Sequence, residues 1–154
     1  MSVKSSMKKQ VITVLDTDDL GTAAKKFVKY HIGTLPVINA EGKLVGVLQL
    51  RDLLTLVMPV FTQLMEDFDF VSTFGAANSI QPSKEEIAKK VSEVMESPVC
   101  VDDTCGLKRA FALLHHYNLT DLPVVDADNC LIGIASRVDV GTTLLKRWEI
   151  VSGD

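Results

Sequence analysis

The sequence predicts a mixed α/β (α+β) protein in which two similar β-α-β-β-α units pack through their small sheets, with a helical spacer between them. Three observations support this fold class. A chain of 154 residues with 47% apolar and 23% charged residues has the composition of a globular protein. A segment near the N-terminus recurs near the C-terminus. Each copy contains only a few short apolar runs, which are too few to bury both faces of a sheet without a partner.

The repeat is clearest at residues 35–47, LPVINAEGKLVGV, which align with residues 122–134, LPVVDADNCLIGI. Each position lies 87 residues before its counterpart, and the alignment runs without a gap from Val14 and Val101 to Asp52 and Asp139. Two halves in register over this length are not expected by chance. The sequence therefore predicts one unit at residues 8–57, a non-repeated helical spacer at 58–92 and a second unit at 93–147.

Each unit begins with a strand and a helix. The apolar stretches 11–15 and 99–102 are expected to be strands, and Thr17 and Thr104 are placed to cap the helices that follow. Apolar residues then recur at helical spacing and predict one buried face in each copy. These faces consist of Leu20, Ala23, Ala24, Phe27 and Val28, and of Leu107, Ala110, Phe111 and Leu114.

Two further strands and a short helix complete each unit. Residues 35–39 and 44–48 are rich in apolar and β-branched side chains, and the turn between them carries Gly42, where a positive φ is useful. Residues 126–129 take the place of this turn in the second copy. The closing helices are expected to begin near Arg51 and near Val138.

The spacer differs in character from the two units. Residues 53–74 have a helical pattern interrupted at Pro59, because proline removes a backbone donor. Ser83 and Glu86 form a capping box that opens another helix. Its predicted buried positions are Ile87, Val91, Val94 and Met95. The aromatic residues Phe61, Phe68, Phe70 and Phe74 either cover the core of the protein or form a surface for a second subunit or partner, to which Trp148 would add.

Composition narrows the classes of function. Acidic residues outnumber basic ones, 20 to 16, so nucleic-acid binding is not expected. No apolar run reaches the 18 residues of a membrane span, and the first residues lack the apolar core of a signal peptide. Three cysteines without CxxC spacing indicate reduced thiols in the cytoplasm. No metal-ligand cluster, P-loop or nucleophile elbow is present, so an enzyme is not expected.

The repeated motifs resemble the CBS domain pair, also called a Bateman module. The residues that carry the resemblance are Leu35-Pro36-Val37-Ile38 with Gly46 to Asp52, and Leu122-Pro123-Val124-Val125 with Gly133 to Asp139. The resemblance covers about two thirds of the chain and leaves out residues 58–92. It implies a stand-alone sensor that binds AMP, ADP, ATP or S-adenosylmethionine in the cleft between the units and has no other cofactor. Two such modules commonly pair, which implies a homodimer.

In this family an aspartate at the end of the motif holds the ribose, a nearby hydroxyl contacts phosphate, and the other unit contributes the wall around the adenine. The resemblance implies two clefts on this chain. One combines Ser136, Arg137 and Asp139 with Ile12, Ile32, Gly33 and Thr34. The other combines Gln49, Arg51 and Asp52 with Val99, Cys100, Leu119 and Thr120.

The two clefts differ in the charges that they offer. The first has the hydroxyl and carboxylate of the motif, but Asp121 lies just before the second Leu-Pro pair, where a carboxylate would repel phosphate. The second has Gln49 in place of the hydroxyl, although Arg51 and His31 supply positive charge. We expect one working site and leave open which cleft provides it.

Structural explanations compete with these functional ones. Asp52 and Asp139 also suit the first turn of a helix, where the dipole favours a carboxylate, and Ser136 suits a helix cap. The sequence therefore predicts a regulatory module that senses an adenosyl compound and passes the information to a separate protein. The alternative is a structural dimerisation module with degenerate, ligand-free clefts.

Overall fold

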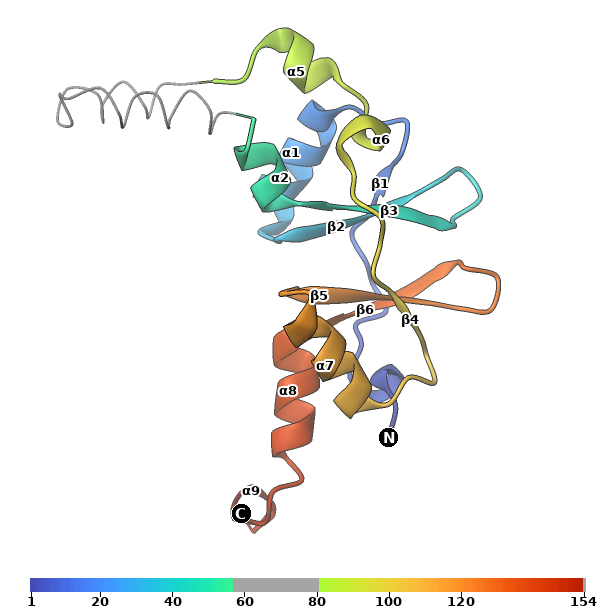
Figure 1. The fold of residues 1–154 in the computed structure, drawn as a ribbon, viewed down its shortest axis with the longest axis vertical. Helices are drawn as coiled ribbons and strands as arrows, with labels where there is room; N and C mark the ends of the chain where they lie inside the picture. The colour runs from blue at the N-terminus through green and yellow to red at the C-terminus, as the bar shows by residue number, and fades with distance from the viewer. Residues whose placement is uncertain (57–80, 154) are drawn as a thin grey trace, which may run out of the picture.

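The computed structural model describes residues 1–56 and 81–153, and it contains two three-stranded sheets stacked on one another (Figure 1). In each sheet the first strand runs parallel to the second, and the second is antiparallel to the third. The first sheet comprises β1 (Val14–Leu15), β2 (Thr34–Ile38) and β3 (Leu44–Gln49), and the second comprises β4 (Val101–Asp102), β5 (Asp121–Val125) and β6 (Leu131–Ser136). The predicted fold class, two similar units packed through small sheets, is confirmed.

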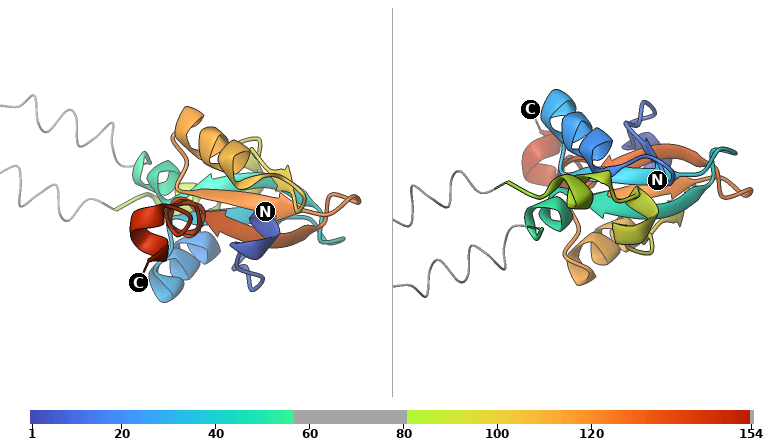
Figure 2. Two further views of the ribbon diagram at one scale, coloured as in Figure 1. Left: turned by 90° about the horizontal axis from the view of Figure 1, so that it is seen from below. Right: turned by 90° about the horizontal axis from the view of Figure 1, so that it is seen from above.

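The principal helices cover the outer face of each sheet, so the two sheets face one another at the centre of the molecule. Seen along the long axis, α1 and α7 lie on opposite sides of the stacked sheets (Figure 2). The first unit carries α1 (Leu20–Tyr30) and α2 (Leu50–Leu54), and the second carries α7 (Leu107–His116) and α8 (Arg137–Leu145). The shorter helices are η1 (Val3–Ser5), α5 (Lys84–Ala88), α6 (Val91–Val94) and α9 (Glu149–Ser152). None of the helices in the described ranges is long and apolar enough to cross a membrane.

The segment that precedes each unit packs on the other unit. Val3 is fully buried in the core of the second unit, and its amide donates to the carbonyl of Cys105 at 2.8 Å. Val91 is likewise buried in the core of the first unit, and its amide donates to the carbonyl of Asp18 at 2.8 Å. The two crossing segments are equivalent under the repeat, and each of them connects the unit that follows it to the core of the other unit.

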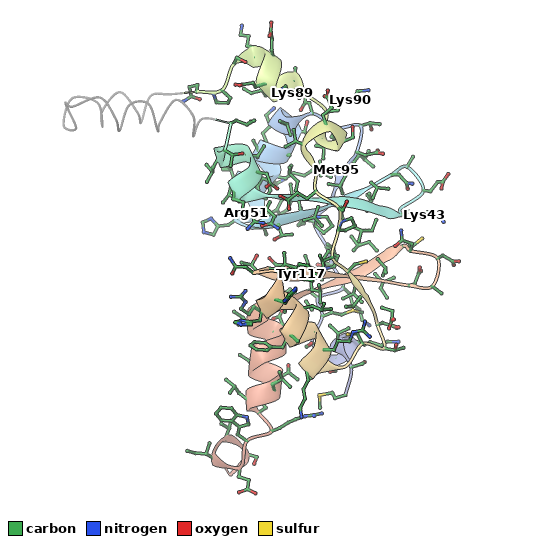
Figure 3. The ribbon with its side chains drawn as sticks, in the orientation of Figure 1. Lys43, Arg51, Lys89, Lys90, Met95 and Tyr117 are labelled. Atoms are coloured by element: carbon green, nitrogen blue, oxygen red, sulfur yellow. The ribbon has the colours of Figure 1, made fainter. Side chains whose placement is uncertain are left out.

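Two glycines allow these crossing segments to approach the sheets. Lys8 bridges to Ile134 on β6, and Glu96 bridges to Val47 on β3. A side chain at Gly133 would overlap Met7, and a side chain at Gly46 would overlap Met95, which lies over β3 (Figure 3). The repeated glycine of the motif is therefore explained by close packing of a methionine from the crossing segment.

The hairpin turns also join the two units. Gly42 has a φ of +80°, and its counterpart Asn129 has a φ of +64°. The amide of Leu44 donates to the carbonyl of Asn129 at 3.0 Å, and the amide of Leu131 donates to the carbonyl of Gly42 at 3.3 Å. These bonds satisfy backbone groups that edge turns otherwise leave to water. The prediction of a left-handed residue at Gly42 is confirmed.

Some local predictions are wrong. Asp19, not Thr17, caps α1, because its carboxylate accepts from the amide of Thr22 at 2.7 Å, and this bond lowers the pKa of Asp19. The corresponding helix α7 begins after Gly106, while Thr104 bonds to the carboxylate of Asp102 instead. An aspartate two residues further along the chain therefore fulfils the capping role expected of Thr17.

The predicted buried faces are correct in part. Leu20, Ala23 and Phe27 are buried, but Val28 is 82% exposed, and Phe111 is 40% exposed. Both lie at the edge of an amphipathic stripe, where periodicity alone does not determine burial. The predicted faces were too wide by one position in each copy.

The capping box of Ser83 and Glu86 is confirmed, since the Ser83 hydroxyl accepts from the Glu86 amide at 3.1 Å. The helix it opens ends at Ala88, and α6 is a separate turn. Val91 is buried as predicted, whereas Ile87 is 37% exposed. The phenylalanines at 61–74 and the break at Pro59 lie outside the described residues.

Replacing Val3 with alanine tests the crossing of the N-terminal segment. Because Val3 is fully buried in the second core, we expect Val3→Ala to lower the free energy of unfolding by about 2 kcal/mol. Val28→Ala deletes the same atoms from an exposed site and should change it by less than about 0.5 kcal/mol. Urea denaturation monitored by circular dichroism measures both. Equal effects of the two variants would contradict the packing of Val3 in the core.

Candidate functional site

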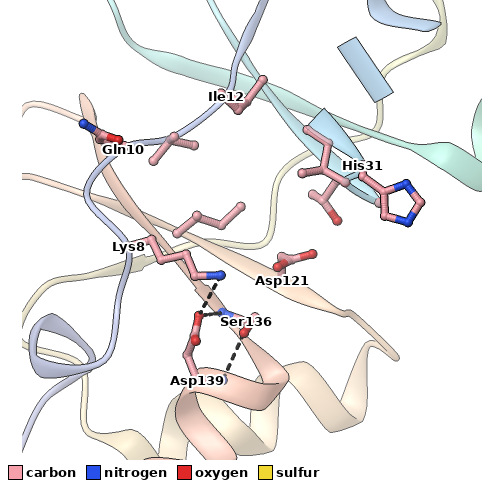
Figure 4. A pocket seen from close by; sticks show the side chains of 12 residues that line it. Lys8, Gln10, Ile12, His31, Asp121, Ser136 and Asp139 are labelled. Atoms are coloured by element: carbon pink, nitrogen blue, oxygen red, sulfur yellow. Dashed lines mark hydrogen bonds and ion pairs between the residues drawn. The ribbon is translucent and has the colours of Figure 1, made fainter. Parts of the chain in front are cut away.

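Two cavities are each lined by residues of both units. The first has a volume of about 290 Å³ and is enclosed by residues from both units and from the crossing segment (Figure 4). Its lining includes Ser136 and Asp139 from the second unit, Ile32, Gly33 and Thr34 from the first, and Ile12 from the connection before β1. The family resemblance assigned all six residues to one cleft, and the structure brings them together.

The polar wall of this first pocket is the start of α8. The hydroxyl of Ser136 accepts from the amide of Asp139 at 2.9 Å, and Oδ2 of Asp139 accepts from the amide of Ser136 at 3.2 Å. This reciprocal capping box holds both side chains in place where β6 ends and the helix begins. The capping explanation for Ser136 and Asp139 is therefore correct as a structural role. It leaves the hydroxyl hydrogen of Ser136 and Oδ1 of Asp139 free of the capping bonds.

The opposite wall of the first pocket is apolar. Ile12 and Ile32, which form this wall, are half-buried, and Ile134 adds a third aliphatic side chain from β6, the strand that carries Ser136. Lys8 reaches the same pocket from the crossing segment, with its Nζ 3.9 Å from Oδ2 of Asp139. The pocket thus combines an aliphatic surface with a hydroxyl, a carboxylate and an ammonium group. That combination suits a ligand with a flat apolar ring, vicinal hydroxyls and a negative group.

The second pocket occupies the pseudo-equivalent position and has a volume of about 310 Å³. Gln49 and Arg51 from the first unit line it together with Val99 and Leu119, as the sequence predicted for the other cleft. The guanidinium of Arg51 lies 3.9 Å from the carboxylate of Glu96. Arg51 is labelled in Figure 3 together with Tyr117, which lines the same pocket from the second unit.

The structure places four predicted residues away from the pocket linings. Arg137 turns to the end of α7, where its Nη2 donates to the carbonyl of Leu119 at 2.9 Å and to that of Leu114 at 3.1 Å. Asp52 lies behind Gln49 and accepts from its amide at 2.6 Å.

The other two, Thr120 and Cys100, lie near the centre and the side of the molecule. The Thr120 hydroxyl is 3.3 Å from that of Thr34 and donates to the carboxylate of Asp121 at 2.9 Å. Cys100 lines a different hollow beside Cys105, and burial raises the pKa of both thiols. Neither cysteine is therefore favoured as a thiolate nucleophile.

Lys8 and Glu96 are charged lining residues that sequence reasoning missed. It also missed the uncharged lining residues Gln10, Val11, Val47, Ser97, Tyr117, Pro123 and Ile134. Lys8 and Glu96 occupy equivalent places in the two pockets, because each belongs to a segment that crosses to the other unit. Met7-Lys8 and Met95-Glu96 repeat at a spacing of 88 rather than 87 residues. A repeat search that allowed a gap of one residue would have found this pair. Within the described ranges, no group of histidine, cysteine and carboxylate side chains could hold a metal ion.

Comparison with known families and structures places this geometry in context. The family model described as CBS domain matches residues 3–59 and 91–144. The chain is 32% identical to a CBS domain-containing protein of Dictyostelium discoideum, over 97% of this chain and 94% of that protein. It is 30% identical to protein MJ1426 of Methanocaldococcus jannaschii, over 94% of this chain and 92% of that protein.

A third relative has a solved structure. The chloroplastic protein CBSX2 of Arabidopsis thaliana is 37% identical over 77% of this chain, which spans about half, 52%, of that relative. The crystal structure of CBSX2 in complex with AMP matches this fold with a TM-score of 0.71 and 28% identity, covering 94% of this chain and 96% of that one.

The placement of Arg137 leads to a prediction about stability. Because its guanidinium bonds two carbonyls at the end of α7, we expect Arg137→Gln to lower the free energy of unfolding by about 2 kcal/mol. Arg109→Gln removes the same charge from an exposed site on α7 and should have little effect. Thermal or urea denaturation compares the two variants. A neutral Arg137→Gln would show that these bonds do not stabilise the second unit.

Proposed function

The chain belongs to the CBS domain family, and from this premise we propose that it is a regulatory module that binds AMP or a related adenosyl compound between its two units. The observation that carries the proposal is the first pocket. Ser136 and Asp139 face an aliphatic wall contributed by the other unit. Support comes from CBSX2, a relative of similar fold that was crystallised with AMP. The proposal includes no catalytic step, since a sensor needs only different affinities for two packings of its units.

The residues of the first pocket suggest a role for each part of the ligand. Oδ1 of Asp139 would accept from the ribose hydroxyls, because Oδ2 already accepts from the amide of Ser136. The Ser136 hydroxyl would donate to the phosphate at the start of α8, where the helix dipole favours an anion. Ile12 and Ile32 would cover the adenine faces. Lys8, whose side chain is 69% exposed, would pair with the phosphate from the solvent side.

We propose that the first pocket is the working site. In the second pocket, Gln49 replaces the serine hydroxyl, and Glu96 stands where the first pocket has Lys8. The ion pair of Arg51 with Glu96 engages the cation that would otherwise attract a phosphate. A nucleotide there would have to break this pair or lie beside an additional carboxylate.

A thermal-shift panel tests this proposal with a matched pair of variants. We expect AMP at about 100 times its dissociation constant to stabilise the wild type by about 2.7 kcal/mol. Asp139→Ala should abolish the shift, and Asp52→Ala should retain it. The two substitutions remove the same type of capping bond, so their effects on stability match and the ligand response separates them. ADP, ATP, adenosine, NAD and S-adenosylmethionine complete the panel.

Each result that contradicts this expectation leads to a different conclusion. Loss of the shift in Asp52→Ala but not in Asp139→Ala would move the working site to the second pocket. No shift with any of the adenosyl compounds would favour the alternative, a structural dimerisation module with ligand-free clefts. In either role we propose that the protein acts in the cytoplasm on a separate target protein, without binding nucleic acid.

We propose that the chain forms a homodimer through helices of the second unit. A hollow of about 620 Å³ between α7, α8 and the turn before α9 is lined by Phe111, Leu145 and Trp148. Trp148, just before α9, is 59% exposed, and Val138, on α8 outside the lining of this hollow, is 70% exposed. Apolar side chains gathered in this way are typical of interfaces.

Light scattering after size-exclusion chromatography tests the dimer. We expect the wild type to have twice the mass of the chain, and Val138→Asp to have the mass of one chain because it buries a charge in the interface. Val138→Thr keeps the branched shape without a charge and should remain dimeric. A monomeric wild type would refute the dimer, and a dimeric Val138→Asp would place the interface elsewhere.

A further inference from the structure

Asp121 is the one acidic residue in the described part of the chain that lines both pockets. It is the first residue of β5 and lies between the units, opposite Ser136 in the sheet register. In the first pocket it lies between Ser136 and His31 (Figure 4). A charge at this position therefore acts on a ligand in either pocket.

The charge of Asp121 is not balanced by a neighbouring cation. None of the ion pairs in residues 1–56 and 81–153 includes Asp121. Its hydrogen bond comes from the neutral hydroxyl of Thr120, which itself lies 3.3 Å from the hydroxyl of Thr34. The repeat places Thr34, which has no charge, at the position equivalent to Asp121. The centre of the molecule thus holds one unpaired carboxylate where internal symmetry would give two similar residues.

The lysine and the arginine that line the two pockets each lie beside another carboxylate. In the first pocket Lys8 pairs with Asp139, and in the second Arg51 pairs with Glu96. His31, which was predicted to supply positive charge to the second cleft, instead lines the first pocket and is exposed. A phosphate that enters the first pocket therefore meets Asp121 and a single lysine, Lys8, which is shared with Asp139. A phosphate that enters the second pocket meets Asp121 and an arginine that is shared with Glu96. Between partly buried groups such repulsion is screened less than at an open surface.

We propose that Asp121 is a specificity-determining residue shared by both pockets, which selects adenosyl ligands of low negative charge and disfavours polyphosphates. This inference rests on the proposed function and deepens it. AMP and uncharged nucleosides are accepted, whereas each further phosphate of ADP and ATP adds repulsion from the same carboxylate. Because Asp121 lines both pockets, the same charge preference applies to whichever pocket takes the ligand.

Calorimetric titration of adenosine, AMP and ATP into the wild type and Asp121→Asn tests the inference. The amide keeps the size of the side chain and an oxygen that accepts from Thr120, so folding should be retained. We expect Asp121→Asn to bind AMP at least about tenfold more tightly than the wild type does. The affinity for ATP should increase by a larger factor, and the affinity for adenosine should not change. Glu85→Gln removes one negative charge from exposed α5, outside both pocket linings, and should leave all three affinities unchanged.

Two blocking variants show whether one carboxylate serves both pockets. Gly33 lines the first pocket, and a Cβ added there meets no atom within 4 Å, so Gly33→Trp is introduced to block that pocket. Ser97 is exposed and lines the second pocket, so Ser97→Trp fills that one. In each blocked variant that still binds a nucleotide, adding Asp121→Asn should increase the affinity for AMP more than the affinity for adenosine.

The outcomes separate this inference from the proposed function. Binding of AMP and adenosine with no change in Asp121→Asn would overturn the role of Asp121 and leave the sensor function intact. An increase in affinity that is equal for adenosine and ATP would also overturn the role of Asp121, because the effect would not depend on the charge of the ligand. Asp121→Asn could tighten AMP binding in one blocked variant but not in the other, although both bind AMP. That result would show that Asp121 does not act on both pockets. If adenosine and AMP bind to no variant, the proposed function and this inference fail together.

Discussion

The structure depends on the burial of one small sheet against another. Each sheet has three strands and carries its principal helices on one face, so the other face has to be covered by its partner. The central strands show this directly. Leu35, Pro36 and Val37 are consecutive and all buried, as are Leu122, Pro123 and Val124. Because side chains alternate between the faces of a strand, consecutive burial means that both faces are covered. Leu35 and Val37 belong to the helix-covered core, which leaves Pro36 for the face that meets the other unit.

Exchange of the preceding segments makes the pairing of the units reciprocal. Val3 completes the core of the second unit, and Val91 completes that of the first. Neither unit therefore has its full core when its own continuous segment is taken alone. Each pocket consequently has walls from both units and from a crossing segment, and a ligand that binds there contacts all three. This arrangement provides a physical route by which occupancy of a pocket can alter the packing of the units.

The polar groups of the pockets have a structural role of their own. Ser136 and Asp139 cap α8, and Asp52 bonds to the backbone at the start of α2. Capping restricts these side chains before any ligand arrives, which reduces the entropy lost on binding. The two pockets nevertheless differ, since Lys8 stands in the first where Glu96 stands in the second. Their difference comes from the crossing segments rather than from the strands and helices that the repeat makes similar.

The sequence by itself determined the repeat, the fold class and six residues of the first pocket. The repeat and the fold class follow from local information: apolar periodicity, the turn at Gly42 and two copies of one motif in register. The six pocket residues follow from the resemblance of that motif to the CBS domain pair. Only the tertiary structure decided which residues complete each site. Lys8 and Glu96 enter the pockets because their segments cross to the other unit, and local patterns do not encode such a crossing. Arg137 leaves its predicted cleft because two carbonyls at the end of α7 attract its guanidinium. Asp121 lines both pockets because β5 begins at the centre of the stacked sheets, a position that exists only once the units have packed.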